Sequence, residues 1–262
     1  MLQKISFMTF NVRIAVDSDP FLWRDRLGSI LQIIKRYQPD VLGVQETREH
    51  MYEDLRRTLE EYDSYAVSSI PGDPIGQSNA LFIRKNAFAA AEKESFMLSQ
   101  TPDVPASKGW DAACERICSY VLLCSPDGGQ SLLHVFNTHL DHVSAYARAQ
   151  GLRLIAQKAQ EKRRRQPVPF VIMGDFNDTP GSPIFNELAD KAVSCYSLFP
   201  STEENLLTFH DYSAKTHGQP IDYIYAGAGA GFCQCEIIRD FPQNIPPSDH
   251  YPVFASVHFE TQ

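Results

Sequence analysis

The sequence has no hydrophobic run that approaches the roughly 18 residues needed to cross a membrane as a helix. Residues 1–6 also lack the long apolar stretch and small-residue cleavage site of a secretion signal. Segments rich in proline, glycine and serine, which would separate two domains, are missing too. These absences predict a cytoplasmic protein without a membrane span, formed by a single domain over residues 1–262.

Positive charge and suitably spaced cysteines are scarce as well. The chain has 24 Lys and Arg against 32 Asp and Glu, and its net charge of -8 argues against a protein that coats nucleic acid. The cysteines, which number 6, lie mostly in apolar runs, and Cys233 and Cys235 lack the spacing of a zinc knuckle. The basic run at 162–165 is explained by the end of a predicted helix, where cations offset the helix dipole.

Amphipathic stretches and short apolar runs alternate along the chain. Apolar residues recur at helical spacing from Trp23 to the stop at Gln38-Pro39, over about 48–60, over 144–165 with Ser144 as cap, and briefly near 184–188. Predicted strands cover Ile5 to the Asn11-Val12-Arg13 segment, 40–45, 65–70, 80–84, 88–98, 116–124, 132–138, 170–173, 221–225, 232–238 and 251–259. The alternation indicates an α/β protein, and a strand, helix, strand order in each half suits two sheets packed together.

Polar side chains stand where many of these predicted strands end. They are Asn11, Glu46, Asn137, His139, Asp141, Asp175, Asn177, Asp222, Asp249 and His250. An acid beside a strand core is costly unless a cation, a histidine or hydrogen-bond donors hold it. A set of carboxylates and amides favours a hard cation such as Mg²⁺ or Mn²⁺, and such cations favour phosphate as the substrate group.

The order of these segments resembles that of the endonuclease/exonuclease/phosphatase superfamily, which is deoxyribonuclease-I-like and has bacterial members. The motifs are Thr9-Phe10-Asn11-Val12-Arg13, Gln45-Glu46, Asn137-Thr138-His139-Leu140, Gly174-Asp175-Phe176-Asn177, Ile221-Asp222-Tyr223-Ile224 and Ser248-Asp249-His250. Each motif alone is weak, but together they span nearly the whole chain in the family order.

This resemblance implies a four-layer α/β sandwich, in which two mixed β-sheets pack face to face with helices outside. It also implies a divalent-metal-dependent phosphoester hydrolase, with a phosphodiesterase as the first expectation, acting by in-line attack of water. Three groups of residues would carry the reaction. Glu46, Asn11 and Asp249 would bind the metal; His250, oriented by Asp222, would contact the scissile phosphate; and Asp175, Asn177 and His139 would position water and phosphoryl oxygens. Either Asp175 or His250 would be the general base.

Two further residues are candidates for binding the substrate phosphate. Arg116 opens a strand, and in the family a similar arginine helps bind phosphate or the metal shell; a surface ion pair with Glu115 or Asp111 is the alternative. His210, in Thr208-Phe209-His210, is expected to reach the substrate pocket or to be an ordinary loop histidine. Asp141 and His142 follow His139 closely in the sequence. Each of them either supports the site residues or lies in a solvated loop.

The sequence does not determine the substrate, because a small phosphodiester, a nucleotide, a nucleic acid or a lipid headgroup fits the same chemistry. We expect a monomer. Three other functions are to be weighed: a phosphomonoesterase, a non-catalytic binding module on the same fold, and a zinc hydrolase using His139, His142 and His210.

Overall fold

The structure, a computed structural model, describes residues 2–200, 203, 205–227, 229–241 and 245–260. The described strands form two mixed sheets of six strands each. The first sheet holds, in spatial order, β11 (Ala230–Ile237), β12 (Val253–Glu260), β1 (Leu2–Asn11), β2 (Val41–Thr47), β4 (Ser78–Arg84) and β3 (Tyr62–Tyr65). The second holds β5 (Ala89–Met97), β6 (Ile117–Cys124), β7 (Ser131–His139), β8 (Phe170–Asp175), β10 (Asp222–Gly227) and β9 (Ala192–Ser194).

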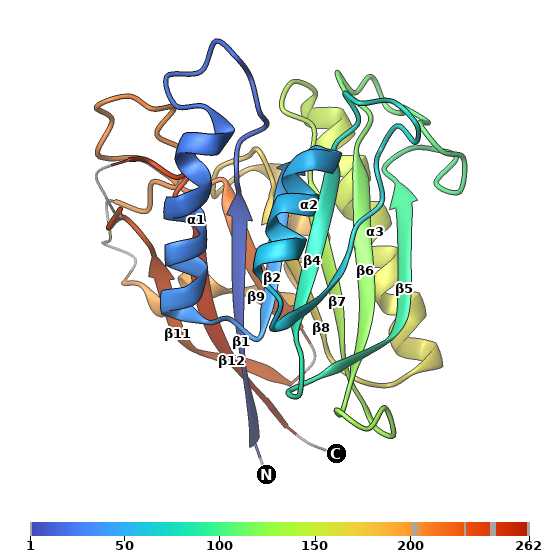
Figure 1. Cartoon of the computed structure of the whole chain (residues 1–262). Coiled ribbons are helices and arrows are strands. Elements are labelled where there is room, and N and C mark those ends of the chain that lie inside the picture. Colours follow the sequence, from blue (N-terminus) through green and yellow to red (C-terminus); the bar gives the residue numbers. More distant parts are fainter. Residues whose placement is uncertain (1, 201–202, 204, 228, 242–244, 261–262) are drawn as a thin grey trace.

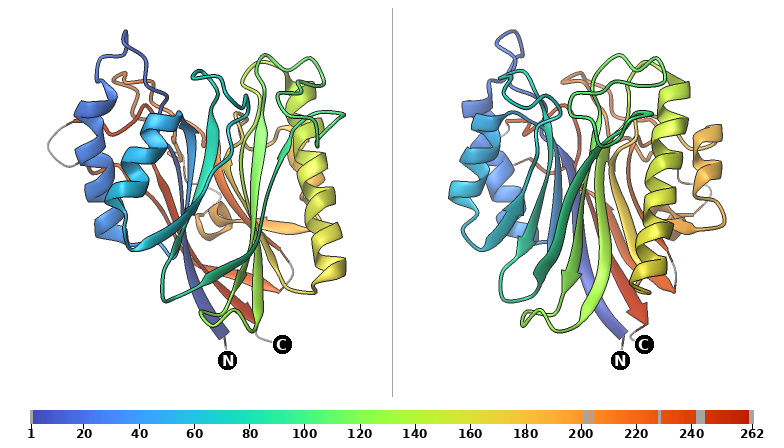
Figure 2. Two further views of the ribbon diagram at one scale, coloured as in Figure 1. Left: turned by 45° about the vertical axis from the view of Figure 1, so that its right-hand side comes forward. Right: turned by 90° about the vertical axis from the view of Figure 1, so that its right-hand side faces the viewer.

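Helices cover the outer faces of both sheets. On the first sheet lie α1 (Trp23–Tyr37) and α2 (Glu49–Thr58), and on the second lies α3 (Ala145–Arg165) (Figures 1 and 2). Short 3-10 turns follow at η1 (Pro183–Glu187) and η2 (Cys195–Leu198). The predicted four-layer α/β sandwich is therefore confirmed. None of the helices in the described ranges is long and apolar enough to cross a membrane.

Three apolar clusters fill the spaces between these layers. One lies between the two sheets and includes Phe7, Val135 and Ile224. The other two lie under α3 and under α1 with α2. Strands with both faces covered read as nearly continuous apolar runs, as in β6, whose residues are all buried. That residues 1–262 form a single domain stays a prediction. The terminal residues Met1, Thr261 and Gln262 are among those that lie outside the described ranges.

Most predicted elements match the observed ones, with some differences. The predicted strand at 65–70 is wrong, because β3 ends at Tyr65 and only Ser68 forms an isolated bridge further on. The chain turns there instead, at Pro71-Gly72, where Gly72 has a positive φ of 80°. Sequence patterns also missed β9, which is only three residues long and lies at a sheet edge.

Each sheet contains one parallel strand pair, and these pairs place the polar strand ends together. In the first sheet β1 runs parallel to β2, with Asn11 opposite Gln45. In the second sheet β7 runs parallel to β8, with His139 opposite Asp175. The antiparallel neighbour β10 begins at Asp222, which pairs with Asp175. Because parallel strands end at the same edge, the strand-end residues gather at one end of the sandwich.

The buried arginine Arg26 joins the chain segments at this end. Its side chain is 0% exposed and donates to Pro247 O at 2.9 Å, Arg13 O at 3.0 Å and Phe21 O at 3.0 Å. It also contacts Val12 O. Arg26 therefore links α1 to the segment after β1 and to the segment before Ser248-Asp249-His250.

Replacing Arg26 with Met leaves these carbonyl oxygens without their donor. We expect the Arg26→Met substitution to lower the free energy of unfolding by about 3 kcal/mol, because an unsatisfied buried acceptor costs about 1–3 kcal/mol. Urea denaturation measures this value. The matched control is Arg24→Met, because the Arg24 side chain is 81% exposed, and we expect it to change stability by less than about 0.5 kcal/mol. Equal unfolding midpoints for the two variants would contradict the prediction.

Candidate active site

Asn11 is the last residue of β1, and Glu46 is the second-last residue of the neighbouring strand β2. The pairing of β2 with β4 shifts register between Val44 and Thr47, and Glu46 has a positive φ of 65°. Such a bulge re-aims a side chain near the end of a strand. Asn11 Nδ2 then donates to Glu46 Oε1 at 2.9 Å, and Ile14 N donates to Glu46 Oε2 at 2.8 Å. Both oxygens of the Glu46 carboxylate are thus fixed in position.

Asp175 lies at the end of β8, where it meets the first sheet. Asn11 Nδ2 donates to Asp175 Oδ2 at 3.0 Å, across a sequence separation of 164 residues. The preceding Gly174 is required, because it has a φ of 145° and a Cβ there would lie 1.9 Å from Thr138 O. The Gly-Asp-Phe-Asn motif therefore contains a glycine that lets β8 pass close to β7.

His139 and Asn177 form a second group next to Asp175. Asn177 has a positive φ of 52°, and its Nδ2 lies 2.8 Å from His139 Nε2 and 3.0 Å from Leu140 O. Burial, with the charges of Arg116 and His250, holds the pKa of His139 well below its ordinary value. The ring is therefore neutral and accepts at Nε2, which leaves the proton on Nδ1. Nδ1 has no hydrogen-bond partner among the described residues and lies 3.9 Å from Glu46 Oε1.

His250 and Asp222 form a buried pair next to Asp175. His250 Nδ1 lies 2.9 Å from Asp222 Oδ2, and its Nε2 lies 3.7 Å from Asp175 Oδ2. Burial lowers the pKa of His250, but the charges of Asp222 and Asp175 outweigh it and raise the pKa to about 10. The imidazole is therefore a cation. Burial and the Asp222 charge raise the pKa of Asp175 above its ordinary value.

Asp249 is buried in the segment before β12. Ser248 Oγ donates to Asn11 O at 2.6 Å, which attaches this segment to the end of β1. Asp249 Oδ2 lies 3.7 Å from Arg13 Nε, while Arg13 pairs more closely with Asp19 at 2.9 Å. Burial raises the pKa of Asp249, and the charge of Glu46 adds to this effect.

The chemistry of these groups fits a hard divalent cation. Glu46 and Asp249 are carboxylates whose mutual repulsion a cation would relieve, and Asn11 offers an amide next to them. Ligand atoms of Asp175, Asp222 and His250 also lie within 4.8 Å of one another. In that group, however, the imidazolium of His250 already pairs with the Asp222 carboxylate, so Glu46, Asn11 and Asp249 stay the predicted metal ligands.

Arg116 immediately precedes β6, and its charge acts on His139. Its Nη2 is 3.1 Å from His142 Nδ1, and its side chain is buried. The alternative ion pair with Glu115 or Asp111 is not formed in the described structure. Asp141 has a structural role, since its carboxylate accepts from the backbone N–H groups of Ala113, Cys114, Val143 and Ser144.

His210 lies behind the His250 segment. Its ring is 4.5 Å from that of Tyr251, and its backbone N donates to Asp249 O at 2.9 Å. Burial and the His250 charge lower the pKa of His210 to about 4. The described residues do not bring His139, His142 and His210 together within ligating distance, so the zinc arrangement is not formed there.

Sequence reasoning missed several supporting residues. Thr208 Oγ1 accepts from Ile221 N at 2.9 Å and Asp222 N at 3.2 Å, and the Phe209 ring lies 4.8 Å from that of His250. The Thr208-Phe209-His210 motif is the sequence signal for these contacts, because all three of its residues lie against the Asp222 and His250 segments. Asn137 faces the interior, where it accepts from Gln45 Nε2 at 2.7 Å and joins the two sheets.

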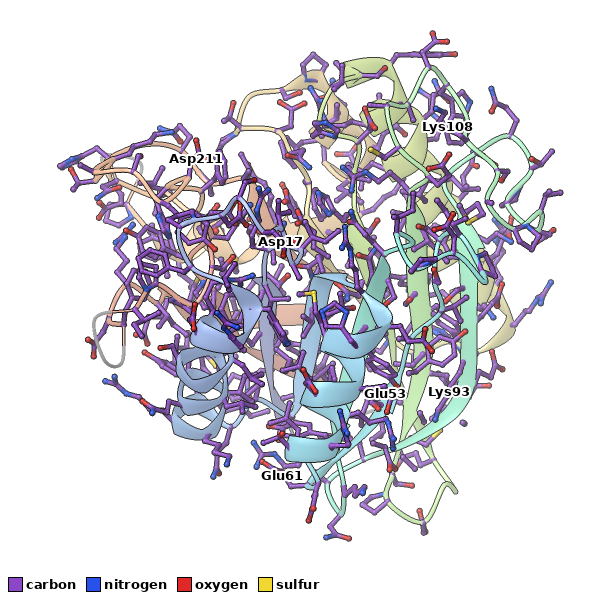
Figure 3. All side chains as sticks on the ribbon, turned by 45° about the horizontal axis from the view of Figure 1, so that its top comes forward. Asp17, Glu53, Glu61, Lys93, Lys108 and Asp211 are labelled. Atoms are coloured by element: carbon purple, nitrogen blue, oxygen red, sulfur yellow. The ribbon has the colours of Figure 1, made fainter. Side chains whose placement is uncertain are left out.

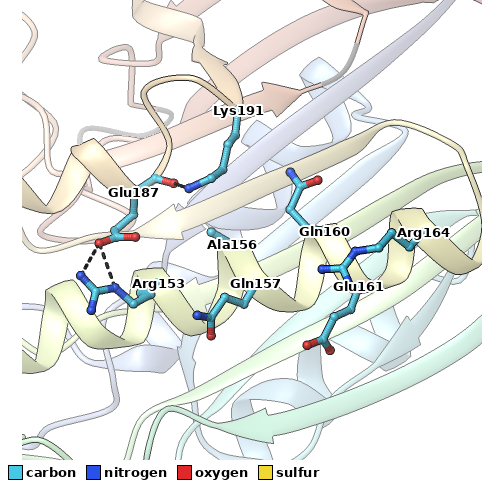
Figure 4. A pocket seen from close by; sticks show the side chains of 8 residues that line it. All are labelled: Arg153, Ala156, Gln157, Gln160, Glu161, Arg164, Glu187 and Lys191. Atoms are coloured by element: carbon cyan, nitrogen blue, oxygen red, sulfur yellow. Dashed lines mark hydrogen bonds and ion pairs between the residues drawn. The ribbon is translucent and has the colours of Figure 1, made fainter.

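Loops surround the end of the sandwich where the site lies. Asp211 and Lys108 mark loops on opposite sides, and Asp17 lies between them in this view (Figure 3). A separate hollow is formed on the outer surface by α3 and η1, where Arg153 pairs with Glu187 at 2.8 Å (Figure 4). No predicted site residue lines that hollow.

Comparisons with known proteins agree with this architecture. A family model described as Endonuclease/Exonuclease/phosphatase family matches residues 8–250. Human nocturnin is 24% identical over 226 residues, which cover 78% of this chain and 48% of nocturnin, so this chain spans about half of that relative. A family protein from Bacteroides thetaiotaomicron superimposes with a TM-score of 0.90 and 28% identity over 100% of both chains. The mannosyl-6-phosphatase of the same organism gives a TM-score of 0.88 and 28% identity over 97% and 99%.

Proposed function

Because the chain belongs to the endonuclease/exonuclease/phosphatase family, we propose that it is a divalent-metal-dependent phosphoester hydrolase that breaks a P–O bond by in-line attack of water. One observation carries the proposal. The Asn11 amide lies 2.9 Å from Glu46, 3.0 Å from Asp175 and 3.5 Å from His250. Residues from both sheets thus form one cluster of carboxylates, amides and a charged imidazole.

Glu46, Asn11 and Asp249 would hold Mg²⁺ or Mn²⁺, which would supply positive charge to the phosphate when bound. Side chains of the protein would stabilise and bind the phosphoryl oxygens. The His250 imidazolium, charged by Asp222, would stabilise the negative charge that develops on a phosphoryl oxygen. The neutral His139 ring, whose Nε2 accepts from the Asn177 amide, would donate a hydrogen bond from Nδ1 to the same phosphate.

Asp175 is the better candidate for the general base. A base works best when its pKa lies near the working pH, and burial raises the pKa of Asp175 in that direction. His250 is already protonated and has no free lone pair for an attacking water. Asp175 Oδ1 is held by Asn177 N at 2.9 Å, so the carboxylate is oriented before substrate arrives.

Two ester classes are candidates for the substrate. A phosphodiester, in a small molecule, a nucleotide, a nucleic acid or a lipid headgroup, is the class expected from the sequence motifs. A phosphomonoester is the second candidate. It is favoured by the similarity to the Bacteroides thetaiotaomicron mannosyl-6-phosphatase over 97% of this chain.

Turnover of two chromogenic esters with and without EDTA tests the proposal. We expect hydrolysis of bis(4-nitrophenyl) phosphate or 4-nitrophenyl phosphate to fall by about 10²-fold or more in EDTA and to return with Mg²⁺ or Mn²⁺. The absence of turnover of either ester would support a non-catalytic binding module. Preferential activation by Zn²⁺ would support the zinc hydrolase instead.

A further inference from the structure

The two segments that carry His139 and Asn177 are joined by one arginine, Arg148, on the neighbouring helix α3. Arg148 Nε donates to Asp178 Oδ2 at 2.9 Å, and its Nη1 donates to Asp141 O at 3.0 Å. Asp141 lies two residues after His139, and Asp178 directly follows Asn177. One planar guanidinium therefore holds the segment after β7 and the segment after β8 at a fixed spacing.

The place of Arg148 near the start of α3 is unfavourable for the helix itself, because the first turn of a helix carries a partial positive charge that repels a cation. The ion pair with Asp178 offsets this repulsion. The two side chains are only 12% and 15% exposed, whereas Arg153, which pairs with Glu187 on the same helix, is 49% exposed. Water screens the Arg148 pair less, so it contributes more than an exposed pair of the same length.

Asp178 is held by three contacts, which fix the backbone of the residue before it. Besides the bond from Arg148, its backbone oxygen accepts from Tyr223 Oη at 2.9 Å, and its Oδ1 accepts from Thr179 N at 3.0 Å. The preceding Asn177 has a positive φ of 52°, in the left-handed region that is costly for residues other than glycine. Such a conformation persists only where its surroundings hold it, so the contacts of Asp178 keep Asn177 in place.

The geometry of Asn177 in turn fixes the ring of His139. Asn177 Nδ2 lies 3.0 Å from Leu140 O, which can only accept, so the nitrogen of the amide faces this side. The same Nδ2 lies 2.8 Å from His139 Nε2. A ring nitrogen that accepts from an amide carries no proton, so the proton of the neutral ring is on Nδ1. His139 Nδ1 has no partner among the described residues and can donate to a phosphate.

We propose that Arg148 and Asp178 are positioning residues of the active site. Their ion pair holds Asn177 against His139 and thereby selects the ring tautomer that carries the proton on Nδ1. The inference deepens the proposed phosphoester hydrolysis, on which its kinetic part rests, because this proton is the one that would be donated to the phosphate. Arg148 and Asp178 act through Asn177 and do not touch the substrate.

The tautomer of His139 is measured first, because this measurement does not depend on turnover. A long-range proton–nitrogen NMR spectrum of the Mg²⁺-loaded protein with isotope-labelled histidine shows which ring nitrogen carries the proton. We expect Nδ1 alone to be protonated in the wild type. In Arg148→Met the shifts of the two ring nitrogens should be averaged between the tautomers, because Asn177 is no longer held. Arg148→Lys, which restores the charge without the fork, should lie between the two.

Turnover of the two chromogenic esters provides the second measurement. Arg148→Met should lower kcat about 10²-fold and change KM less than about 3-fold, because a misplacement of about 1 Å in a catalytic group costs this much. Arg148→Lys should recover part of the activity. Asp178→Asn should lower kcat about 10-fold, and adding it to Arg148→Met should lower kcat no further, because the two residues act as one pair.

Arg153→Met is the matched control, because it removes another ion pair of α3, the one with Glu187 at 2.8 Å on the outer surface (Figure 4). It should leave both kcat and the His139 spectrum unchanged. If Arg148→Met does not fold, as judged by circular dichroism, Arg148→Lys and Asp178→Asn still decide the question.

The outcomes separate the two levels of the proposal. A wild-type His139 protonated on Nε2, an unchanged His139 spectrum in the Arg148 and Asp178 variants, or equal losses of kcat in Arg148→Met and Arg153→Met would overturn the inference while phosphoester hydrolysis stands. Lack of turnover of either ester by the Mg²⁺-loaded wild type would instead reject the proposed function. The NMR comparison would then still decide whether the ion pair selects the tautomer.

Discussion

Glu46→Gln is expected to lower kcat/KM about 10³-fold and to remove most of the affinity for Mn²⁺. The substitution preserves the shape of the side chain and the hydrogen bond from Ile14 N at 2.8 Å, but it removes the acceptor of Asn11 Nδ2 and the charge that a hard cation requires. A loss of this size is comparable to removal of a major electrostatic contribution to the transition state. Steady-state kinetics and isothermal titration calorimetry with Mn²⁺ measure the two effects.

The thermal stability of the metal-free protein separates a ligand from a structural residue. The Glu46 charge raises the pKa of Asp249, so the two carboxylates repel each other before a cation binds. Metal-free Glu46→Gln should therefore unfold at a temperature no lower than that of the metal-free wild type. Glu49→Gln is the control, because Glu49 is exposed at the start of α2 and should not alter Mn²⁺ binding. Unchanged Mn²⁺ affinity in Glu46→Gln would remove this residue from the metal site.

His250→Ala should reduce kcat/KM by about 10³-fold or more, and Asp222→Asn by about 10²-fold. The alanine removes the imidazolium, whereas the asparagine leaves a ring that has lost its main source of charge. The pH titration of the His250 ring by NMR should show a pKa well below the wild-type value of about 10 in Asp222→Asn. His50→Ala, an exposed residue on α2, is the control for loss of a histidine.

The same pair predicts how stability depends on pH. Because the folded pKa of His250 is raised above the ordinary 6.5, its contribution to stability is complete below about pH 6.5 and is lost as the pH rises through about 10. The difference in unfolding free energy between wild type and Asp222→Asn should therefore shrink over that range. A difference that grows with pH, or a His250 pKa that Asp222→Asn does not change, would show that Asp222 does not charge the imidazole.

Some features of the fold followed directly from local patterns, and others did not. The run Ile117–Cys124 is apolar except for Ser119, which identifies a strand covered on both faces, and β6 is such a strand. Ser144 was predicted as a helix cap, and its Oγ accepts from Ala147 N at 3.1 Å. The strand predicted at 65–70 failed because similar residues also occur in loops that pack on a core. Ala66 packs there without belonging to a strand.

The residues of the candidate site likewise include some that the motifs identified and others that only the structure identified. Motif order was sufficient to select Glu46, Asp175 and His250, because each follows or precedes an apolar run. It gave no information on Arg26, whose backbone acceptors are ordinary carbonyl groups, such as Pro247 O at 2.9 Å. The sequence also left Arg116 undecided, since a neighbouring Glu115 suggested an ion pair that the described structure does not form.

The sequence alone determined the family, the alternation of strands and helices, and the polar residues that stand at the strand ends. These are local properties, because periodicity and motif order are written along the chain. Only the tertiary structure decided that Asn11 bridges Glu46 and Asp175, that His250 is charged and that Arg116 pairs with none of the described carboxylates. Burial and through-space distance set charge states and ion pairs, and both come into being only when distant segments fold together.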